Sequence, residues 1–343
     1  MSKSELAAVI DCGTNTFNLL IAEIKVDTWK AVIRTKRVVK LGAQGLSHGI
    51  LGPAAQQRAI KALLSYREIL AEKEVKKISV LGTAAIRDAR NGNEFLKRVK
   101  DETGFVINLI SGKEEARLIY EGVKASGALD TESALIMDIG GGSTEFILCN
   151  GTNIFWKHSF RLGAARLLEA VSPSDPLTKS DVIRLNRLLK KELLPLFEAC
   201  ERFKPTLLVG SSGSFDTFIA LIQRDGLPRR AKTTGQKTAR KKHQPISPEN
   251  WKNLYTRLRA SSQAERLKMP GMLAMRADMI VMAASLIEFV RKSTRIKNIQ
   301  QCSYALKEGV ISIMDKQSKK GKSFKPVRQN NKERNPIPKR KNK

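Results

Sequence analysis

Two glycine-rich stretches of the chain combine the residue types that bind phosphate groups and divalent cations. In ALIMDIGGGSTEFILCN an apolar run ends at Asp138, and a second apolar run follows Glu145. The small residues between them offer backbone N–H and hydroxyl donors to an anion, and they are Gly140, Gly141, Gly142, Ser143 and Thr144. The pattern predicts strand, tight loop and strand, with two carboxylates that could hold a divalent cation. A glycine hairpin without a ligand is the alternative for this loop taken alone.

The N-terminal stretch AAVIDCGTNTFNLLIAEI repeats this form more than a hundred residues earlier. Asp11 corresponds to Asp138, and the small residues that follow it include Thr14, Asn15 and Thr16. Both stretches read as apolar run, Asp-x-Gly-x-x-Ser/Thr, apolar run. A repeated motif indicates two related half-molecules of βββαβα type. Each half would carry one phosphate-binding hairpin, and the two hairpins would face each other across a cleft.

Three further charged residues follow predicted strands, where ligand-facing groups collect in α/β sheets. Arg87 lies just beyond a strand expected over residues 75–82, and a surface salt bridge is its alternative role. Glu114 and Glu115 fall in the first turn of a helix that follows a strand expected over residues 105–110. The helix dipole favours carboxylates there in any protein. Their place after a strand end points both at the cleft, where a carboxylate could orient a water molecule or accept its proton.

Composition narrows the classes of partner. The 343 residues suggest about two domains, and a net charge of +29 indicates a polyanionic partner such as nucleic acid, polyphosphate or a highly phosphorylated nucleotide. No apolar run is long enough for a membrane span, and the N-terminus has no signal-peptide layout. A cytoplasmic location is expected. Four scattered cysteines indicate reduced thiols, and three isolated histidines argue against a zinc site or a histidine triad.

Three segments outside these motifs give further expectations. The basic stretch 229–243 predicts an exposed loop. Five methionines near a long apolar helix are expected to be core residues, namely Met269, Met272, Met275, Met279 and Met282. From Lys316 the chain is rich in Lys, Arg, Asn and Pro, which predicts a disordered tail. That tail is either a solubilising segment or an arm that contacts polyanions.

The motifs together resemble the exopolyphosphatase and guanosine pentaphosphate phosphatase (Ppx/GppA) family, part of the actin, sugar-kinase and heat-shock-chaperone superfamily. The matching pieces occur in the family's order, and they are AVIDCGTNTFNLLIAEI, LGTAAIRDARN, ISGKEEARLIYEGV, LIMDIGGGSTEF, LLVGSSGSFDT and MRADMIVMAA. The resemblance implies an α/β fold of two actin-like (ribonuclease H-like) domains with the active-site cleft between them. It also implies Mg²⁺-dependent (or Mn²⁺-dependent) removal of a terminal phosphate from a phosphoanhydride chain.

The resemblance also implies roles for individual residues. Glu115 matches the family's catalytic glutamate, and Arg87 matches a phosphate-facing arginine. The implied metal-associated acids are Asp138, Glu145 and Asp11. The implied phosphate-binding residues are Thr14, Asn15, Thr16, Gly140, Gly141, Gly142, Ser143 and Thr144. The expected divisions are an N-terminal domain over 1–129, a C-terminal domain over 130–302, a terminal helix over 303–315 and a basic tail over 316–343.

Four functions remain open at the level of the sequence. The first is an exopolyphosphatase that acts on inorganic polyphosphate. The second is a guanosine pentaphosphate (pppGpp) 5′-phosphohydrolase, which would use the same loops. The third is an ATP-dependent kinase of the same superfamily. The fourth is a non-catalytic nucleic-acid binder, which the net positive charge favours although the sequence contains no known nucleic-acid-binding motif. Non-specific contact between nucleic acid and the basic tail is compatible with any of the other three functions. A homodimer is a further expectation from the family.

Overall fold

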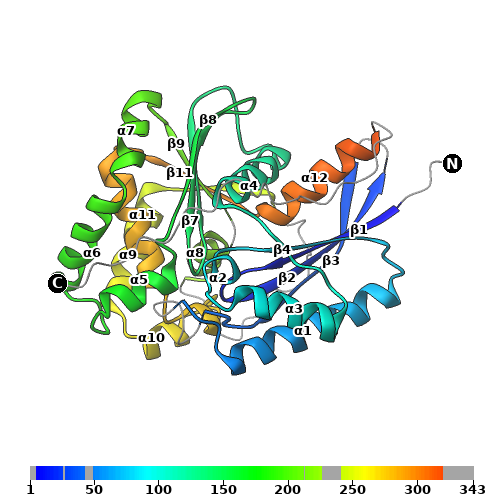
Figure 1. Ribbon diagram of the computed structural model, residues 1–343. Coiled ribbons are helices and arrows are strands. Elements are labelled where there is room, and N and C mark those ends of the chain that lie inside the picture. Colours follow the sequence, from blue (N-terminus) through cyan, green and yellow to red (C-terminus); the bar gives the residue numbers. More distant parts are fainter. Residues whose placement is uncertain (1–4, 26–27, 43–48, 212, 226–240, 320–343) are drawn as a thin grey trace.

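The first half of the chain forms a five-stranded mixed sheet. The computed structural model describes residues 5–25, 28–42, 49–211, 213–225 and 241–319 (Figure 1). The strands of this sheet are β1 (Glu5–Cys12), β2 (Thr16–Lys25), β3 (Thr28–Val38), β4 (Lys77–Gly82) and β5 (Asn108–Leu109). Their order is β3-β2-β1-β4-β5, with β1–β3 antiparallel and β4 and β5 parallel to β1. The strand expected over residues 105–110 is confined to Asn108–Leu109, because β5 pairs with β4 only at the end of that strand.

The second sheet repeats this plan with one extra strand. Its strands are β6 (Ala134–Ile139), β7 (Thr144–Cys149), β8 (Ile154–Phe160), β9 (Leu207–Ser211), β10 (His243–Ile246) and β11 (Asn298–Cys302). The order β10-β11-β9-β6-β7-β8 reads, from the β8 edge, as the order of the first sheet followed by β10. The predicted α/β fold with two related halves is therefore confirmed. Strand β10 was not predicted, since its first residue, His243, was assigned to the basic loop.

Helices cover both faces of the first sheet. They are α1 (Pro53–Glu72), α2 (Ala84–Arg87), α3 (Gly92–Thr103) and α4 (Gly112–Ser126). Alternate residues of β1 point to opposite faces, so Ala8 and Ile10 pack with α1 and α3, while Ala7 and Val9 pack on the side of α4. Pro53 begins α1, as expected for a residue that has no N–H to satisfy.

The second half carries its helices mainly on the face away from α4. They are α5 (Ala164–Val171), α6 (Lys179–Glu192), α7 (Leu194–Phe203), α8 (Gly213–Gln223), α9 (Pro248–Ala260), α10 (Gln263–Lys268), the 3₁₀ turn η1 (Ala274–Arg276) and α11 (Ile280–Thr294). The helical stretch 179–203 breaks at Leu193, before the predicted breaker Pro195. Trp251 and Met282 lie in the centre of this core.

The last described helix, α12 (Leu306–Lys319), returns to the first half. It leaves the end of β11 and packs on α4, β1 and β2 (Figure 1). Trp29 of β3 donates from Nε1 to the Ser312 hydroxyl of α12 at 3.1 Å. Helices α4 and α12 thus form a layer between the two sheets, and one apolar cluster includes residues of both sheets and both helices.

The expected domain limits are only partly visible in this arrangement. Helix α12 runs to Lys319, beyond the predicted helix end at Asp315, because its helical pattern continues into the basic segment. The boundary at residues 129 and 130 stays a prediction. Residues 226–240 of the predicted basic loop and residues 320–343 of the predicted tail lie outside the described residues.

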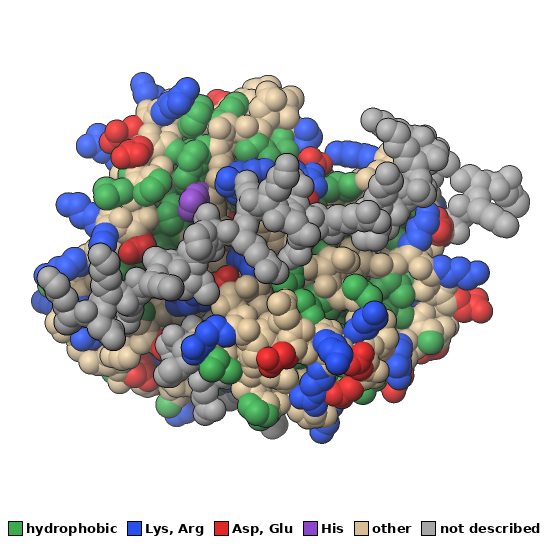
Figure 2. All heavy atoms as spheres, in the orientation of Figure 1, with side chains coloured by type: hydrophobic (Ala, Val, Ile, Leu, Met, Phe, Trp, Pro, Cys, Tyr) green, Lys and Arg blue, Asp and Glu red, His purple; other side chains and the backbone are tan. Residues whose placement is uncertain are grey.

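The surface reflects the excess of basic residues. Lys and Arg number 62 against 33 Asp and Glu, and Figure 2 shows both kinds of charge interspersed around the visible face. The positive charge of the described residues is therefore spread over this face and not gathered in one patch. None of the helices in the described ranges combines the length and the apolar character that a bilayer span requires.

Candidate active site

The two glycine-rich loops line one cavity of about 120 Å³. The predicted phosphate-binding residues that line it are Thr14, Asn15, Thr16, Gly140, Gly141, Gly142 and Ser143. The loops approach each other closely, since a Cβ atom on Gly141 would lie 2.9 Å from Asn15 Nδ2 and one on Gly142 would lie 2.8 Å from Thr14 Oγ1. Only glycine allows this approach without moving the facing side chains. The prediction that the hairpins face each other across a cleft is confirmed.

The structure leaves Arg87, the predicted phosphate-facing arginine, outside the cavity lining, and it does the same for Thr144. The Thr144 side chain is fully buried, and Oγ1 donates to the Leu162 carbonyl at 2.9 Å. The cause is strand periodicity: Thr144 begins β7, where successive side chains point to opposite faces, so it turns away while Glu145 turns toward the cavity.

Glu115 lies on the cavity wall, in the first turn of α4. It is 8% exposed, and Arg87 Nη1 donates to its Oε2 at 3.2 Å. The same Arg87 nitrogen donates to the Ile110 carbonyl at 2.9 Å, and Arg87 Nε lies 3.5 Å from the Asp88 carboxylate. Burial, together with the nearby Glu145 carboxylate, holds the pKa of Glu115 well above its ordinary value, while Arg87 acts in the opposite direction.

Glu114 does not share this position, so the expectation that both acids point at the cleft was wrong. Its carboxylate forms a two-pronged ion pair with Arg117, with distances of 2.8 and 2.7 Å. Adjacent residues on an α-helix point about 100° apart, so only one of two neighbouring acids can face the cavity. Ser111 caps α4 by accepting from the Glu114 N–H at 3.2 Å, which fixes the helix start and thereby the direction of Glu115.

The three predicted metal-associated acids all line the cavity. Asp138 and Glu145 are cross-strand partners in the β6–β7 hairpin, which places their side chains on one face. Each acid accepts a side-chain hydrogen bond: Asp11 from Asn18 at 3.2 Å, Asp138 from Ser211 at 3.3 Å and Glu145 from Ser159 at 2.7 Å. Glu145 also accepts one from the Ser143 side chain. Desolvation in the cleft raises the pKa of all three, and for Asp138 the neighbouring carboxylates add to this effect.

These acids fit a divalent cation as far as their chemistry goes. They are hard oxygen donors that repel one another, and a cation between them would relieve that repulsion. In the described part of the chain, no three acidic, histidine or cysteine side chains converge closely enough to hold a metal ion by themselves. Mg²⁺ is usually bound by one or two carboxylates together with water and substrate phosphate, so it does not require three converging side chains.

Two cations on the cavity wall were not among the predicted site residues. Arg276 donates from Nη1 to the Ser214 hydroxyl at 3.2 Å, and its Nε is buried with no hydrogen-bond partner among the described residues. Lys307, in the first turn of α12, lowers the pKa of Asp11 and Asp138 by its charge. The duplication could have indicated Lys307. Lys307 follows β11 of the second sheet, just as Glu115 follows the corresponding strand β5 of the first sheet.

Two of the methionines expected in the core also face the cavity. Met275 and Met279 line it, and Asn15 Nδ2 donates to the Met279 sulfur at 3.0 Å. Met282, one turn further along α11, is fully buried as expected. The difference arises because Met275 and Met279 lie in the segment before α11, which lines the cavity, whereas Met282 lies within α11, which runs into the core.

These features define a class of proteins: two α/β halves with the same strand order hold paired glycine-rich loops, a buried glutamate and three further carboxylates around one small cavity. The model of the Ppx/GppA phosphatase family matches residues 20–317. The chain belongs to that family, which confirms the resemblance recognised in its motifs.

Solved structures agree with this assignment. An exopolyphosphatase from Cytophaga hutchinsonii is 35% identical, with a TM-score of 0.86 over 93% of this chain and 99% of that one. The Aquifex aeolicus PPX-GPPA enzyme is 25% identical, with a TM-score of 0.73 over 91% of this chain and 100% of that one. Both extend over the same two halves.

A relative from Photobacterium profundum, named guanosine-5′-triphosphate,3′-diphosphate pyrophosphatase, is 30% identical over 312 residues. The match covers 91% of this chain but 59% of that protein, so the chain spans about three fifths of this relative's length.

Proposed function

We propose that this protein is a Mg²⁺-dependent exopolyphosphatase, which releases terminal orthophosphate from inorganic polyphosphate. The observation that carries the proposal is the position of Glu115: a buried carboxylate, held by Arg87, on the wall of the cavity between the two phosphate loops. The cavity of about 120 Å³ suits the terminal phosphoryl units of a chain, and the net charge of +29 suits a long polyanion as the remainder of the substrate.

The two loops bind the terminal phosphoryl group. Backbone N–H groups of both loops and the hydroxyls of Thr14, Thr16 and Ser143 donate to its oxygens. Arg276 and Lys307 bring positive charge to the same cavity and offset the charge of the phosphate chain. Mg²⁺ held by one or two of the carboxylates of Asp11, Asp138 and Glu145 would further neutralise the phosphate oxygens.

Glu115 orients a water molecule and accepts its proton while the water oxygen bonds to the terminal phosphorus. The bond from that phosphorus to the bridging oxygen breaks, and the chain leaves one phosphate shorter. The raised pKa makes Glu115 a stronger base than an exposed glutamate. Arg87 touches the carboxylate and the Ile110 carbonyl, so it keeps the base ionised and correctly turned.

A phosphate-release assay tests the proposal. Long-chain polyphosphate and pppGpp are compared at equal Mg²⁺, and kcat/KM is expected to be higher for polyphosphate. Release from neither substrate would overturn the proposal. Higher kcat/KM for pppGpp would favour the second candidate, a guanosine pentaphosphate 5′-phosphohydrolase, which the name of the Photobacterium relative suggests.

A further inference from the structure

One wall of the cavity is a short irregular segment, residues 271–279. It begins at Gly271, whose φ of +94° is suited to glycine, and ends where α11 starts. Between these points the chain forms only the turn η1, in which Arg276 N donates to the Leu273 carbonyl at 2.8 Å. The segment nevertheless carries three cavity-lining side chains, those of Met275, Arg276 and Met279. Because it lies in no sheet or long helix, contacts with neighbouring segments must hold it in place.

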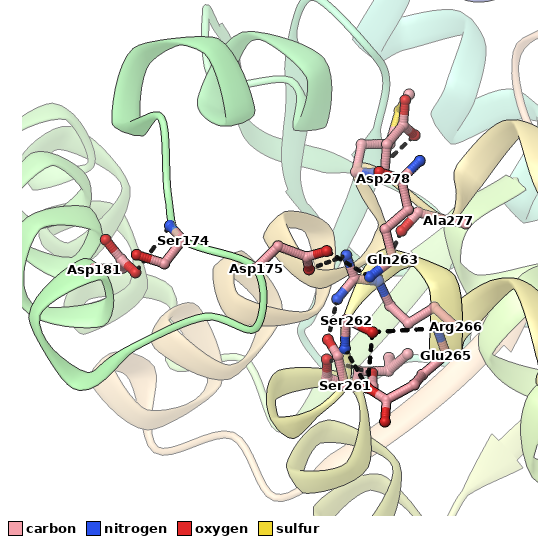
Figure 3. Close-up of polar contacts among 12 residues, drawn as sticks. Ser174, Asp175, Asp181, Ser261, Ser262, Gln263, Glu265, Arg266, Ala277 and Asp278 are labelled. Atoms are coloured by element: carbon pink, nitrogen blue, oxygen red, sulfur yellow. Dashed lines mark hydrogen bonds and ion pairs between the residues drawn. The ribbon is translucent and has the colours of Figure 1, made fainter.

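A buried arginine outside the cavity supplies such a contact (Figure 3). Arg266 of α10 is 2% exposed, and its Nε donates to the Ala277 carbonyl at 2.7 Å. Nη1 donates to the Ser261 carbonyl at 2.5 Å, and Nη2 donates to Asp175 Oδ1 at 2.9 Å. Asp175 lies in the loop between α5 and α6. One guanidinium therefore joins three separate segments, and the wall segment is tied to it directly after Arg276.

Packing alone does not explain why an arginine occupies this buried position. A buried guanidinium is costly to desolvate, and apolar residues of similar volume often stabilise a core as well or better. What arginine adds is a planar group whose donors fix several acceptors in direction. The Asp175 carboxylate is 44% exposed, so this ion pair is not a fully enclosed one. Of the three acceptors that Arg266 holds in place, the Ala277 carbonyl is the one next to the cavity, because Ala277 directly follows Arg276.

We propose that Arg266 is a positioning residue, which sets the direction of the Arg276 guanidinium in the cavity without touching the substrate. The inference rests on the proposed function, because Arg276 is taken to bind the phosphate chain. With the tether in place, Arg276 Nη1 reaches the Ser214 hydroxyl and the guanidinium lies over Gly213, where a side chain would overlap it. Without the tether, the turn that carries Arg276 is free to shift.

Steady-state kinetics on polyphosphate test this role. Arg266→Gln is expected to raise KM about tenfold and to change kcat less than KM, since small displacements of a binding group can cost up to about a hundredfold. Arg276→Ala should lower kcat/KM by at least as much. The double variant should be no worse than Arg276→Ala alone, because Arg266 acts through Arg276. Fully additive losses in the double variant would overturn the proposal.

Amide hydrogen exchange gives a readout that does not depend on activity. Arg266→Gln should speed exchange at residues 274–279 and leave the central strands of both sheets unchanged. The matched control is Arg257→Gln, which removes an arginine paired with Asp225 in the same half and should alter neither the exchange at 274–279 nor KM. Unchanged exchange and unchanged KM in Arg266→Gln would refute the tether.

The two proposals can fail separately. If the unaltered protein releases no phosphate from any phosphoanhydride, the proposed function fails while hydrogen exchange still tests the tether. If Arg266→Gln does not fold, Asp175→Ala takes its place, since it removes one of the three acceptors at a half-exposed residue. Arg266→Lys should restore KM only in part, because one ammonium group cannot reach all three acceptors in the same directions.

Discussion

Replacement of Glu115 by glutamine tests the centre of the mechanism. Glutamine has nearly the same shape, and its carbonyl can still accept the hydrogen bond that Arg87 Nη1 donates at 3.2 Å. What the variant lacks is the ability to take a proton from water. We therefore expect kcat to fall by about 10²–10⁴-fold, the usual contribution of a general base. This corresponds to roughly 3–5 kcal/mol of transition-state stabilisation.

Substrate binding should survive this change. A Glu115 carboxylate faces the cavity in which we propose that phosphate binds, so the loss of its negative charge removes a repulsion. KM for polyphosphate is expected to be unchanged or lower. The variant should therefore separate kcat from KM, which a general loss of structure would not do.

Glu114→Gln is a matched control one residue away. Glu114 is paired with Arg117 and lies outside the cavity lining, so its replacement should change kcat less than about twofold, as expected for a surface ion pair. Both variants are assayed for phosphate release at saturating polyphosphate and Mg²⁺. Turnover of Glu115→Gln within tenfold of the unaltered protein would remove Glu115 from the role of base.

Three further predictions concern the other parts of the site. Asp138→Asn keeps an oxygen that can accept the hydrogen bond of the Ser211 hydroxyl, but it loses the negative charge. The Mg²⁺ concentration for half-maximal activity should therefore rise at least about tenfold, and EDTA should abolish the remaining activity. An unchanged Mg²⁺ titration would contradict this prediction. Thr144→Val removes the hydrogen bond to the Leu162 carbonyl, so it should lower the free energy of unfolding by about 1 kcal/mol and leave KM unchanged. Ser143→Ala should raise KM. The opposite result for the two variants would mean that Thr144, and not Ser143, contacts the substrate. Truncation after Lys319 should raise KM for long polyphosphate and flatten its dependence on salt, and identical kinetics across a salt series would leave the basic tail without a role in binding.

Local patterns made much of this site predictable. The hairpins could be identified because glycine, Asp and hydroxyl residues at fixed spacing act within a few residues of chain, and the repeat at Asp11 and Asp138 supplied the facing partner. Helix α4 begins as predicted because Ser111 is a local cap. Thr144 and Glu114 were assigned the wrong direction, although strand and helix periodicity could have separated each from its neighbour.

Other cavity residues were not predicted, because long-range packing brings them to the cavity. Arg276 and Met279 reach it only when the segment before α11 is held by Gly271 and Arg266. Lys307 depends on α12 crossing back to the first half. No local pattern marks Arg276 or Met279, since contacts between segments far apart in the chain define both positions. For Lys307 the signal lay in the duplication, because Lys307 follows β11 as Glu115 follows β5.

The return of α12 has a consequence for biosynthesis. The first sheet and α4 leave the ribosome early, but the helix that covers the α4 side of this sheet comes only after the whole second half. Until then, apolar residues such as Val9, Leu118 and Val123 lack part of their native cover. The nascent first half is thus expected to need chaperone protection. Lys307 joins the cavity wall only once translation has passed α12, so the cavity is complete only in a chain that includes this helix.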